Sequence, residues 1–122
     1  MSDPLPPLTI SELEDWIIEK GDAVIQRRAF SPELVVPEEE LVYCLWCVDY
    51  GMRNGGDLQP AIDLKQDLTQ EGRRLAGDLK LPKCEALFGL SQSDVEQQYF
   101  AMFESVCSEL KSAYQEMLER RS

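Results

Sequence analysis

The four cysteines are the residues of this chain best suited to metal or redox chemistry. Cys44 and Cys47 form a Cys-x2-Cys pair, whereas Cys84 and Cys107 stand alone. A zinc site usually takes its ligands from two close pairs, and the chain has no histidine to complete one. A redox pair opens a helix, where the dipole stabilises the thiolate, but Cys44 and Cys47 lie inside an apolar run. Because cysteine is among the most buried residue types, we expect four buried thiols, with no metal and no cofactor.

Carboxylates are the other groups with chemical capacity, and acids outnumber bases by 23 to 12. Two carboxylates could serve a hydrolase, but so many acids form pairs by chance, and a small helical core offers little cleft. The chain lacks histidine for general acid–base work, a Gly-x-Ser-x-Gly nucleophile motif and a phosphate-binding P-loop. We therefore expect a protein that is not an enzyme and that uses its acids for binding.

The charge balance favours a basic protein as the partner. A net charge of −11 repels both nucleic acid and acidic membrane surfaces. Ten acids and only three bases lie within residues 1–40, so we expect the acidic face mainly there. The alternative is that these acids only keep the protein soluble. The candidate partner-binding residues are Glu12, Glu14, Asp15, Glu19, Glu38, Glu39, Glu40, Asp63 and Asp67.

Asn54-Gly55-Gly56 is typical of a β-hairpin, a phosphate-binding loop or a helix end. A hairpin needs alternating strands on both sides, and none are present. A phosphate loop needs the glycines before a helix N-terminus, whereas here an apolar run comes first and Asp57 follows. We therefore expect the end of a helix, where Asn or Gly adopts the left-handed conformation.

Helices that carry these residues are indicated by caps and by apolar spacing. Thr9 and Glu12 form a capping box before a first helix whose apolar positions continue to Val24, although Gly21 either ends or weakens it. A second helix begins at Pro37 and is apolar on every side over residues 41–48, which is typical of a central helix.

The second half of the chain predicts three more helical segments. One helix spans residues 60–80 with a stripe of Ala61, Leu64, Leu68, Leu75 and Leu79, and a short one lies between Pro82 and Gly89. The last helix starts at a cap, either Ser91 or the box of Ser93 with Glu96, and its apolar stripe runs from Tyr99 to Met117. The stripe faces either its own core or a second subunit of a homodimer.

These elements together predict an all-α fold, a compact bundle of four or five helices with a central apolar helix and a long C-terminal helix. Residues 1–8, with three prolines, form an extended lead-in, and residues 9–122 form a single helical domain. No run of about 18 apolar residues predicts a membrane span, and the N-terminus lacks the basic and apolar regions of a signal peptide. We therefore expect a cytoplasmic protein that does not bind membranes.

The stretch LVYCLWCVDYGMRNGGDLQ resembles the DNA-mimic protein family, a small bacterial family in which an apolar helix runs into Asn-Gly-Gly-aromatic-x-Gln-aromatic. Asn54, Gly55, Gly56 and Gln59 match this motif, whereas Asp57 and Pro60 replace its aromatics. The later EGRRLAGDLKLPKCEALFGL resembles the helical hairpin that follows in the family, so the resemblance covers roughly residues 37–90.

The resemblance implies an acidic all-helical domain whose carboxylates imitate DNA phosphates toward a DNA-binding protein. It also implies a structural role for the motif, in which Asn54 and Gln59 bond to backbone at a helix junction. Rows on helical faces, either Asp63 with Asp67 or Glu12 with Asp15 and Glu19, could supply the mimicry.

Charge and aromatic content alone keep two other binding functions open. An immunity or antitoxin-type inhibitor of a basic toxin or nuclease needs one acidic patch with aromatic anchors. A secretion or assembly chaperone needs an exposed apolar groove beside the acids. In each case the partner is a protein, with no direct contact to nucleic acid.

Overall fold

The computed structural model describes residues 9–121, which form an all-α fold without strands. The predicted lead-in of residues 1–8 lies outside the described residues. Six α-helices and one 3-10 turn follow one another: α1 (Ile10–Phe30), η1 (Pro32–Leu34), α2 (Pro37–Gly55), α3 (Gln59–Leu64), α4 (Leu68–Asp78), α5 (Pro82–Phe88) and α6 (Gln92–Arg121). The predicted fold class is confirmed, with one helix more than expected.

Helix α1 begins after the Thr9 cap and continues past Gly21. The Thr9 hydroxyl accepts a hydrogen bond from the Glu12 backbone amide over 3.1 Å, which confirms the Thr9 half of the predicted capping box. The Glu12 carboxylate accepts from the Thr9 hydroxyl and not from the Thr9 amide, so the other half of the box is wrong. The helix does not end at Gly21 but runs on to Phe30, with Arg27 and Arg28 in its last turn. A Cβ atom at Gly21 would lie 2.1 Å from Cδ1 of Trp46, so glycine is what allows the indole of α2 to pack against α1.

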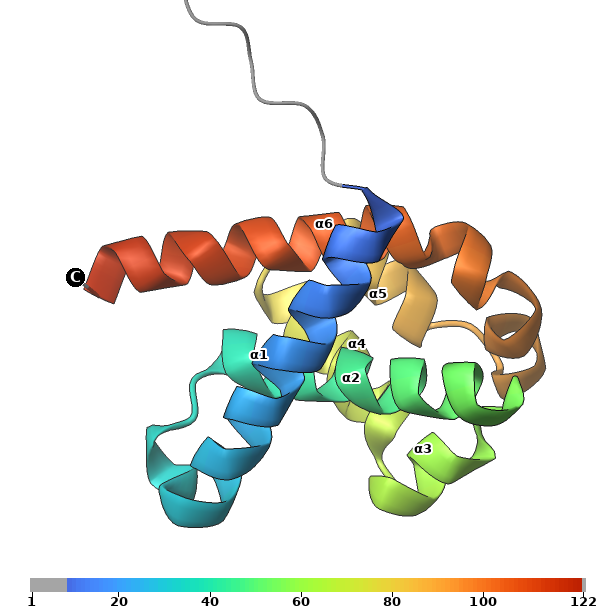
Figure 1. The fold of residues 1–122 in the computed structure, drawn as a ribbon, viewed down its shortest axis with the longest axis horizontal. Coiled ribbons are helices and arrows are strands. Elements are labelled where there is room, and N and C mark those ends of the chain that lie inside the picture. Colours follow the sequence, from blue (N-terminus) through green and yellow to red (C-terminus); the bar gives the residue numbers. More distant parts are fainter. Residues whose placement is uncertain (1–8, 122) are drawn as a thin grey trace, which may run out of the picture.

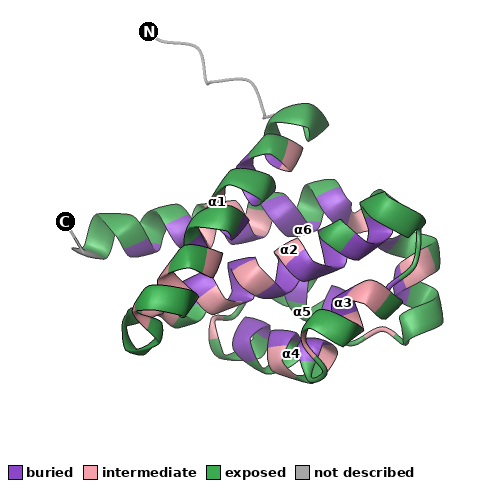
Figure 2. Cartoon of the chain, turned by 60° about the horizontal axis from the view of Figure 1, so that its bottom comes forward, coloured by how far each residue is buried: buried purple, intermediate pink, exposed green. Residues whose placement is uncertain are grey.

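Helix α2 is the central helix, as predicted. It packs against α1, α3, α4 and α6, and Figure 1 shows α1 crossing both α2 and α6. Its apolar run is almost entirely buried, and Figure 2 shows this helix mostly in the colour of buried residues. The helix ends at Gly56, whose φ of 65° and ψ of 23° place it in the left-handed region. The expectation of a helix end at this motif is therefore confirmed.

The helix predicted over residues 60–80 is wrong, because it is two helices separated at Lys65. Lys65 has an extended backbone (φ −147°, ψ 97°) and its amide closes α3 on the Ala61 carbonyl. The predicted stripe is broken as well, since Leu64 is exposed while Leu68 is fully buried. The kink changes the direction of the chain so that α4 can lie on α2 and α5.

Helix α6 is the long C-terminal helix that the spacing predicts. Ser91 provides its cap by accepting from the Asp94 amide over 3.2 Å. The alternative box at Ser93 is wrong, because the Glu96 carboxylate instead accepts from the Leu58 amide over 2.9 Å. Its apolar stripe is buried within the single chain, so the stripe serves this chain's own core. The buried stripe residues are Tyr99, Phe103, Val106, Leu110 and Met117. Of the helices within residues 9–121, none is long and apolar enough to cross a membrane.

Candidate partner-binding surface

The outer face of α1 carries a row of exposed carboxylates, Glu12, Asp15, Glu19 and Asp22. We call these four residues the α1 row; the outer side of α1 is exposed in Figure 2. They are spaced three, four and three residues apart, which keeps them on one helical face. Glu12 accepts from the Thr9 hydroxyl, and Glu19 lies 3.7 Å from the amine of Lys20. Within the described chain, Asp15 and Asp22 have no ion-pair partner.

Asp22 is not among the partner-binding residues that the sequence predicts, although its spacing continues the row. Glu14 is among the predicted residues but does not belong to the row. It is half-buried and its carboxylate lies 3.2 Å from a guanidinium nitrogen of Arg53 in α2. The contact ties α1 to α2 and neutralises the Glu14 charge.

The prediction that the acids at the start of α2 are exposed is wrong for Glu38 and Glu39. Glu38 is 6% exposed and pairs with Arg120 of α6 over 2.9 Å. Glu39 is 3% exposed, and its Oε2 lies 2.6 Å from Nε of Arg27, in a direction too bent for a hydrogen bond. Its other oxygen accepts from the Val36 amide and so caps α2. These carboxylates join the ends of three helices and are buried within the chain.

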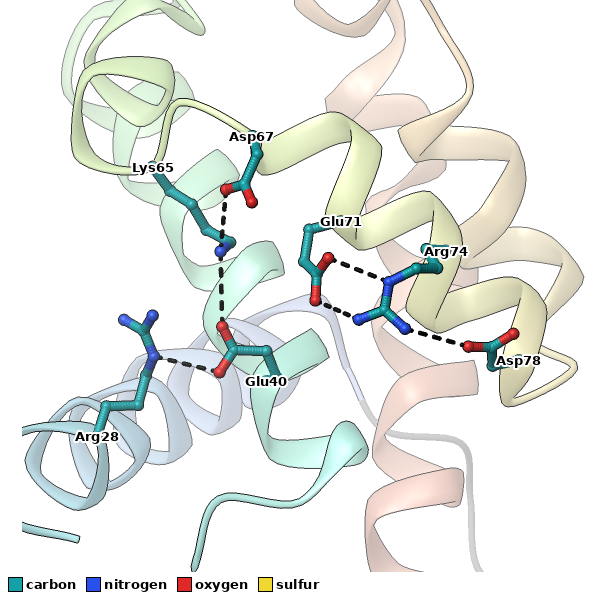
Figure 3. Close-up of polar contacts among 7 residues, drawn as sticks. All are labelled: Arg28, Glu40, Lys65, Asp67, Glu71, Arg74 and Asp78. Carbon is teal, nitrogen blue, oxygen red and sulfur yellow. Dashed lines mark hydrogen bonds and ion pairs between the residues drawn. The ribbon is translucent and has the colours of Figure 1, made fainter. Parts of the chain in front are cut away.

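Glu40 and Asp67 belong to a chain of ion pairs between helices, drawn in Figure 3. Glu40 lies 3.2 Å from Arg28 of α1 and 3.6 Å from Lys65, and Lys65 lies 3.1 Å from Asp67. Burial acts to lower the pKa of Lys65, but the hydrogen bond to Asp67 and the neighbouring acids raise it overall. Asp63 accepts from the Gln59 side-chain amide over 2.9 Å. Neither Asp63 nor Asp67 extends the α1 row, since they lie on α3 and on the turn after it.

A stack of aromatic rings runs along α2 beside α1. Tyr43 and Trp46 are stacked with ring centroids 6.2 Å apart, and Trp46 and Tyr50 with centroids 5.4 Å apart. The guanidinium of Arg28 covers the Tyr43 ring at 3.9 Å. Tyr50, at the other end, is 44% exposed. We call Tyr43, Trp46 and Tyr50 the aromatic ladder.

A hollow of about 290 Å³ opens between α1 and the exposed end of the ladder. Ile18 and Asp22 line it from α1, and the side of α2 that carries Trp46 and Tyr50 forms its other wall. Ile18 is 47% exposed despite its apolar side chain. The hollow therefore combines an aromatic surface, an exposed aliphatic residue and one carboxylate of the α1 row.

A polar cluster of Asp49, Arg53 and Tyr99, of which Asp49 and Arg53 line the hollow, was not found by sequence reasoning. Asp49 is 3% exposed and accepts from the Tyr99 hydroxyl over 2.6 Å and from Nε of Arg53 over 2.8 and 2.9 Å. Burial, and then the negative charge of Asp49, raise the pKa of Tyr99 well above its ordinary value. The available signal was a lone acid directly after the apolar run of α2, four residues before an arginine.

At the Asn-Gly-Gly motif, one of the two backbone contacts that the resemblance implied is present. The Asn54 side chain donates to the Tyr50 carbonyl over 2.7 Å at the end of α2. Gln59 does not bond to backbone through its side chain, which instead donates to Asp63. The Gln59 amide is capped by Asp57 over 2.8 Å. The implied backbone contact of the Gln59 side chain is therefore wrong.

The cysteines are free thiols and all four are fully buried, as predicted. Burial is the main cause that raises the pKa of Cys47 to about 11 and that of Cys107 to about 12, and it raises those of Cys44 and Cys84 further. Among the described residues, no three Cys, Asp or Glu side chains come together in a way that could hold a metal ion.

Comparisons of the chain with protein-family models, with curated proteins and with solved structures find no match. The likeness to the DNA-mimic protein family therefore stays a prediction from the motif.

Proposed function

We propose that this protein is not an enzyme and that it binds a basic protein partner through the α1 row. The contrast between this row and the other predicted acids supports the proposal. Glu38, Glu39, Glu40 and Asp67 are neutralised by arginines or lysines of the same chain. The charges of the α1 row, by comparison, face solvent and are available to steer a positively charged surface toward the protein.

The arrangement supports an acidic patch with aromatic anchors, the form expected of an immunity or antitoxin-type inhibitor. The hollow places Tyr50 and Trp46 next to Asp22, and aromatic side chains frequently dominate the binding energy of interfaces. The basic partner is then a toxin or a nuclease.

Mimicry of DNA is the second form of the proposal, and the spacing of the α1 row can be compared with that of DNA phosphates. From Glu12 to Asp22 the row spans ten residues, or about 15 Å of helix, so its carboxylates follow at intervals of about 5 Å along the axis. One DNA strand carries a phosphate every ~3.4 Å of axis, and the duplex carries a charge every ~1.7 Å. The α1 row is sparser than either, which favours the inhibitor over the mimic.

Two matched variants test the proposal with a decalysine peptide as the basic probe. The first neutralises the α1 row by Glu12→Gln, Asp15→Asn, Glu19→Gln and Asp22→Asn. The control neutralises four exposed acids elsewhere by Glu33→Gln, Asp94→Asn, Glu104→Gln and Glu116→Gln. Both variants change the net charge equally, so any difference between them reports position.

We expect the α1-row variant to bind decalysine about tenfold more weakly, because exposed charge pairs contribute about 0.2–1 kcal/mol each. The control variant should lose much less. Binding by the native protein should fall steeply as salt approaches about 1 M, where charges are screened beyond ~3 Å. Equal losses in the two variants would mean that only net charge matters, and the proposed surface would be wrong.

A further inference from the structure

We propose that the hollow between α1 and α2 receives an arginine side chain of the basic partner. This inference rests on the proposed function and goes beyond it, because it names the residue type that the surface recognises. It starts from the aromatic ladder, whose two ends have unlike environments.

The inner end of the ladder already holds an arginine. The guanidinium of Arg28 lies 3.9 Å from the centre of the Tyr43 ring, while its Nε donates to the Glu40 carboxylate over 3.2 Å. A planar guanidinium can stack on an aromatic ring and pair with a carboxylate at the same time. At this end of the ladder, Arg28 of the same chain makes both contacts, one to the ring and one to the carboxylate.

The outer end offers the same two groups, and Arg53, which also lines the hollow, is paired with Asp49 and Glu14. Tyr50 is 44% exposed, and Asp22, which has no ion-pair partner in the described chain, lines the same hollow. Ile18 lines the hollow as well and can cover the aliphatic part of an arginine side chain.

Arg53 already lines the hollow, but its positive charge does not prevent a second cation from binding there. Arg53 is held by both Asp49 oxygens and by Glu14, so its charge is already compensated. The residues that line the hollow include two carboxylates, Asp22 and Asp49, and one guanidinium, that of Arg53. The net charge is negative, which complements an incoming arginine.

The walls of the hollow are held in place before any partner binds. Trp46 is seated on α1 at Gly21, where any larger residue would meet the indole. Asn54 donates to the Tyr50 carbonyl and secures the last turn of α2. A preformed pocket loses little freedom on binding, which favours recognition of one side chain.

Decaarginine and decalysine peptides of equal charge test the inference, with Tyr50→Leu as the variant and Phe30→Leu as the control. Both residues are exposed aromatics, but Phe30 lies outside the hollow. Dissociation constants are measured at low salt, and circular dichroism checks that the variants keep their helices. In NMR spectra, the indole N–H of Trp46 reports on the hollow, and that of the buried Trp16 is the internal control.

We expect decaarginine to bind the native protein more tightly than decalysine and to shift the Trp46 signal but not that of Trp16. Tyr50→Leu should reduce the ratio of the decalysine dissociation constant to the decaarginine dissociation constant by about two- to fivefold. This factor corresponds to the free energy of an exposed cation–π contact. Phe30→Leu should leave the ratio unchanged.

An unchanged ratio in Tyr50→Leu would overturn the arginine site. If decalysine binding still depended on the α1 row, the proposed function would stand without it. If neither peptide bound the native protein, both would be overturned.

Discussion

Replacing Tyr99 by phenylalanine removes one buried hydroxyl and tests whether the Asp49 cluster holds α2 to α6. The hydroxyl donates to Asp49 over 2.6 Å, Tyr99 is fully buried and Asp49 is 3% exposed. Asp49 keeps both bonds to Arg53 in the variant, so its charge is not left without a partner. A hydrogen bond to a charged group contributes about 1.5–3 kcal/mol, and we expect the free energy of unfolding to fall by that amount.

The loss can be converted into a change of melting temperature. Unfolding entropy of about 2.1 cal/mol/K per residue gives roughly 0.26 kcal/mol/K for the 122 residues of the chain. The expected loss then lowers Tm by about 6–12 °C, which thermal unfolding followed by circular dichroism at neutral pH resolves easily.

Tyr50→Phe is the matched control, because it removes the same hydroxyl from a tyrosine that is 44% exposed. Its effect should stay within about 0.5 kcal/mol, as for most surface substitutions. Adding Asp49→Asn to Tyr99→Phe completes a double-mutant cycle, in which a non-zero coupling energy reports the bond itself. A Tyr99→Phe protein as stable as the control would refute the reasoning.

Three further predictions concern packing, pH and thiol reactivity. Gly21→Ala should destabilise the protein by about 1–3 kcal/mol in urea unfolding, because its Cβ would meet the Trp46 ring, whereas Gly55→Ala, with nothing within 4 Å, should be neutral or stabilising. The free energy of unfolding should fall above about pH 9, because burial raises the pKa values of the thiols and of Tyr99 in the folded protein. The unfolded chain therefore loses these protons at lower pH and is favoured as pH rises. A stability that rises with pH in this range would contradict the prediction. In the native protein the four buried thiols should react with a thiol reagent no faster than the protein unfolds locally, and after denaturation all four should react rapidly. A thiol that reacts rapidly in the native protein would show that a cysteine is exposed.

Local chemistry in the sequence was enough to predict most helices and the role of α2. The Thr9 cap, the Pro37 start and the left-handed Gly56 act within one turn of the chain, so they can be recognised without any tertiary contact. The apolar run of α2 likewise requires neighbours on every side. The division at Lys65 was missed because the apolar spacing of residues 60–80 is compatible with one helix, and packing on α2 decides against it.

The sequence by itself determined that the chain is acidic and helical, with its cysteines in the core. Only the tertiary structure decided which carboxylates face solvent. Glu38 meets an arginine 82 residues away, and Asp49 meets a tyrosine 50 residues away. Such pairs form because the faces of distant helices come together, and no spacing along one helix encodes which face will meet which. For that reason the acids of α2 are buried or paired within the chain, while the α1 row, with Asp22 added, faces solvent.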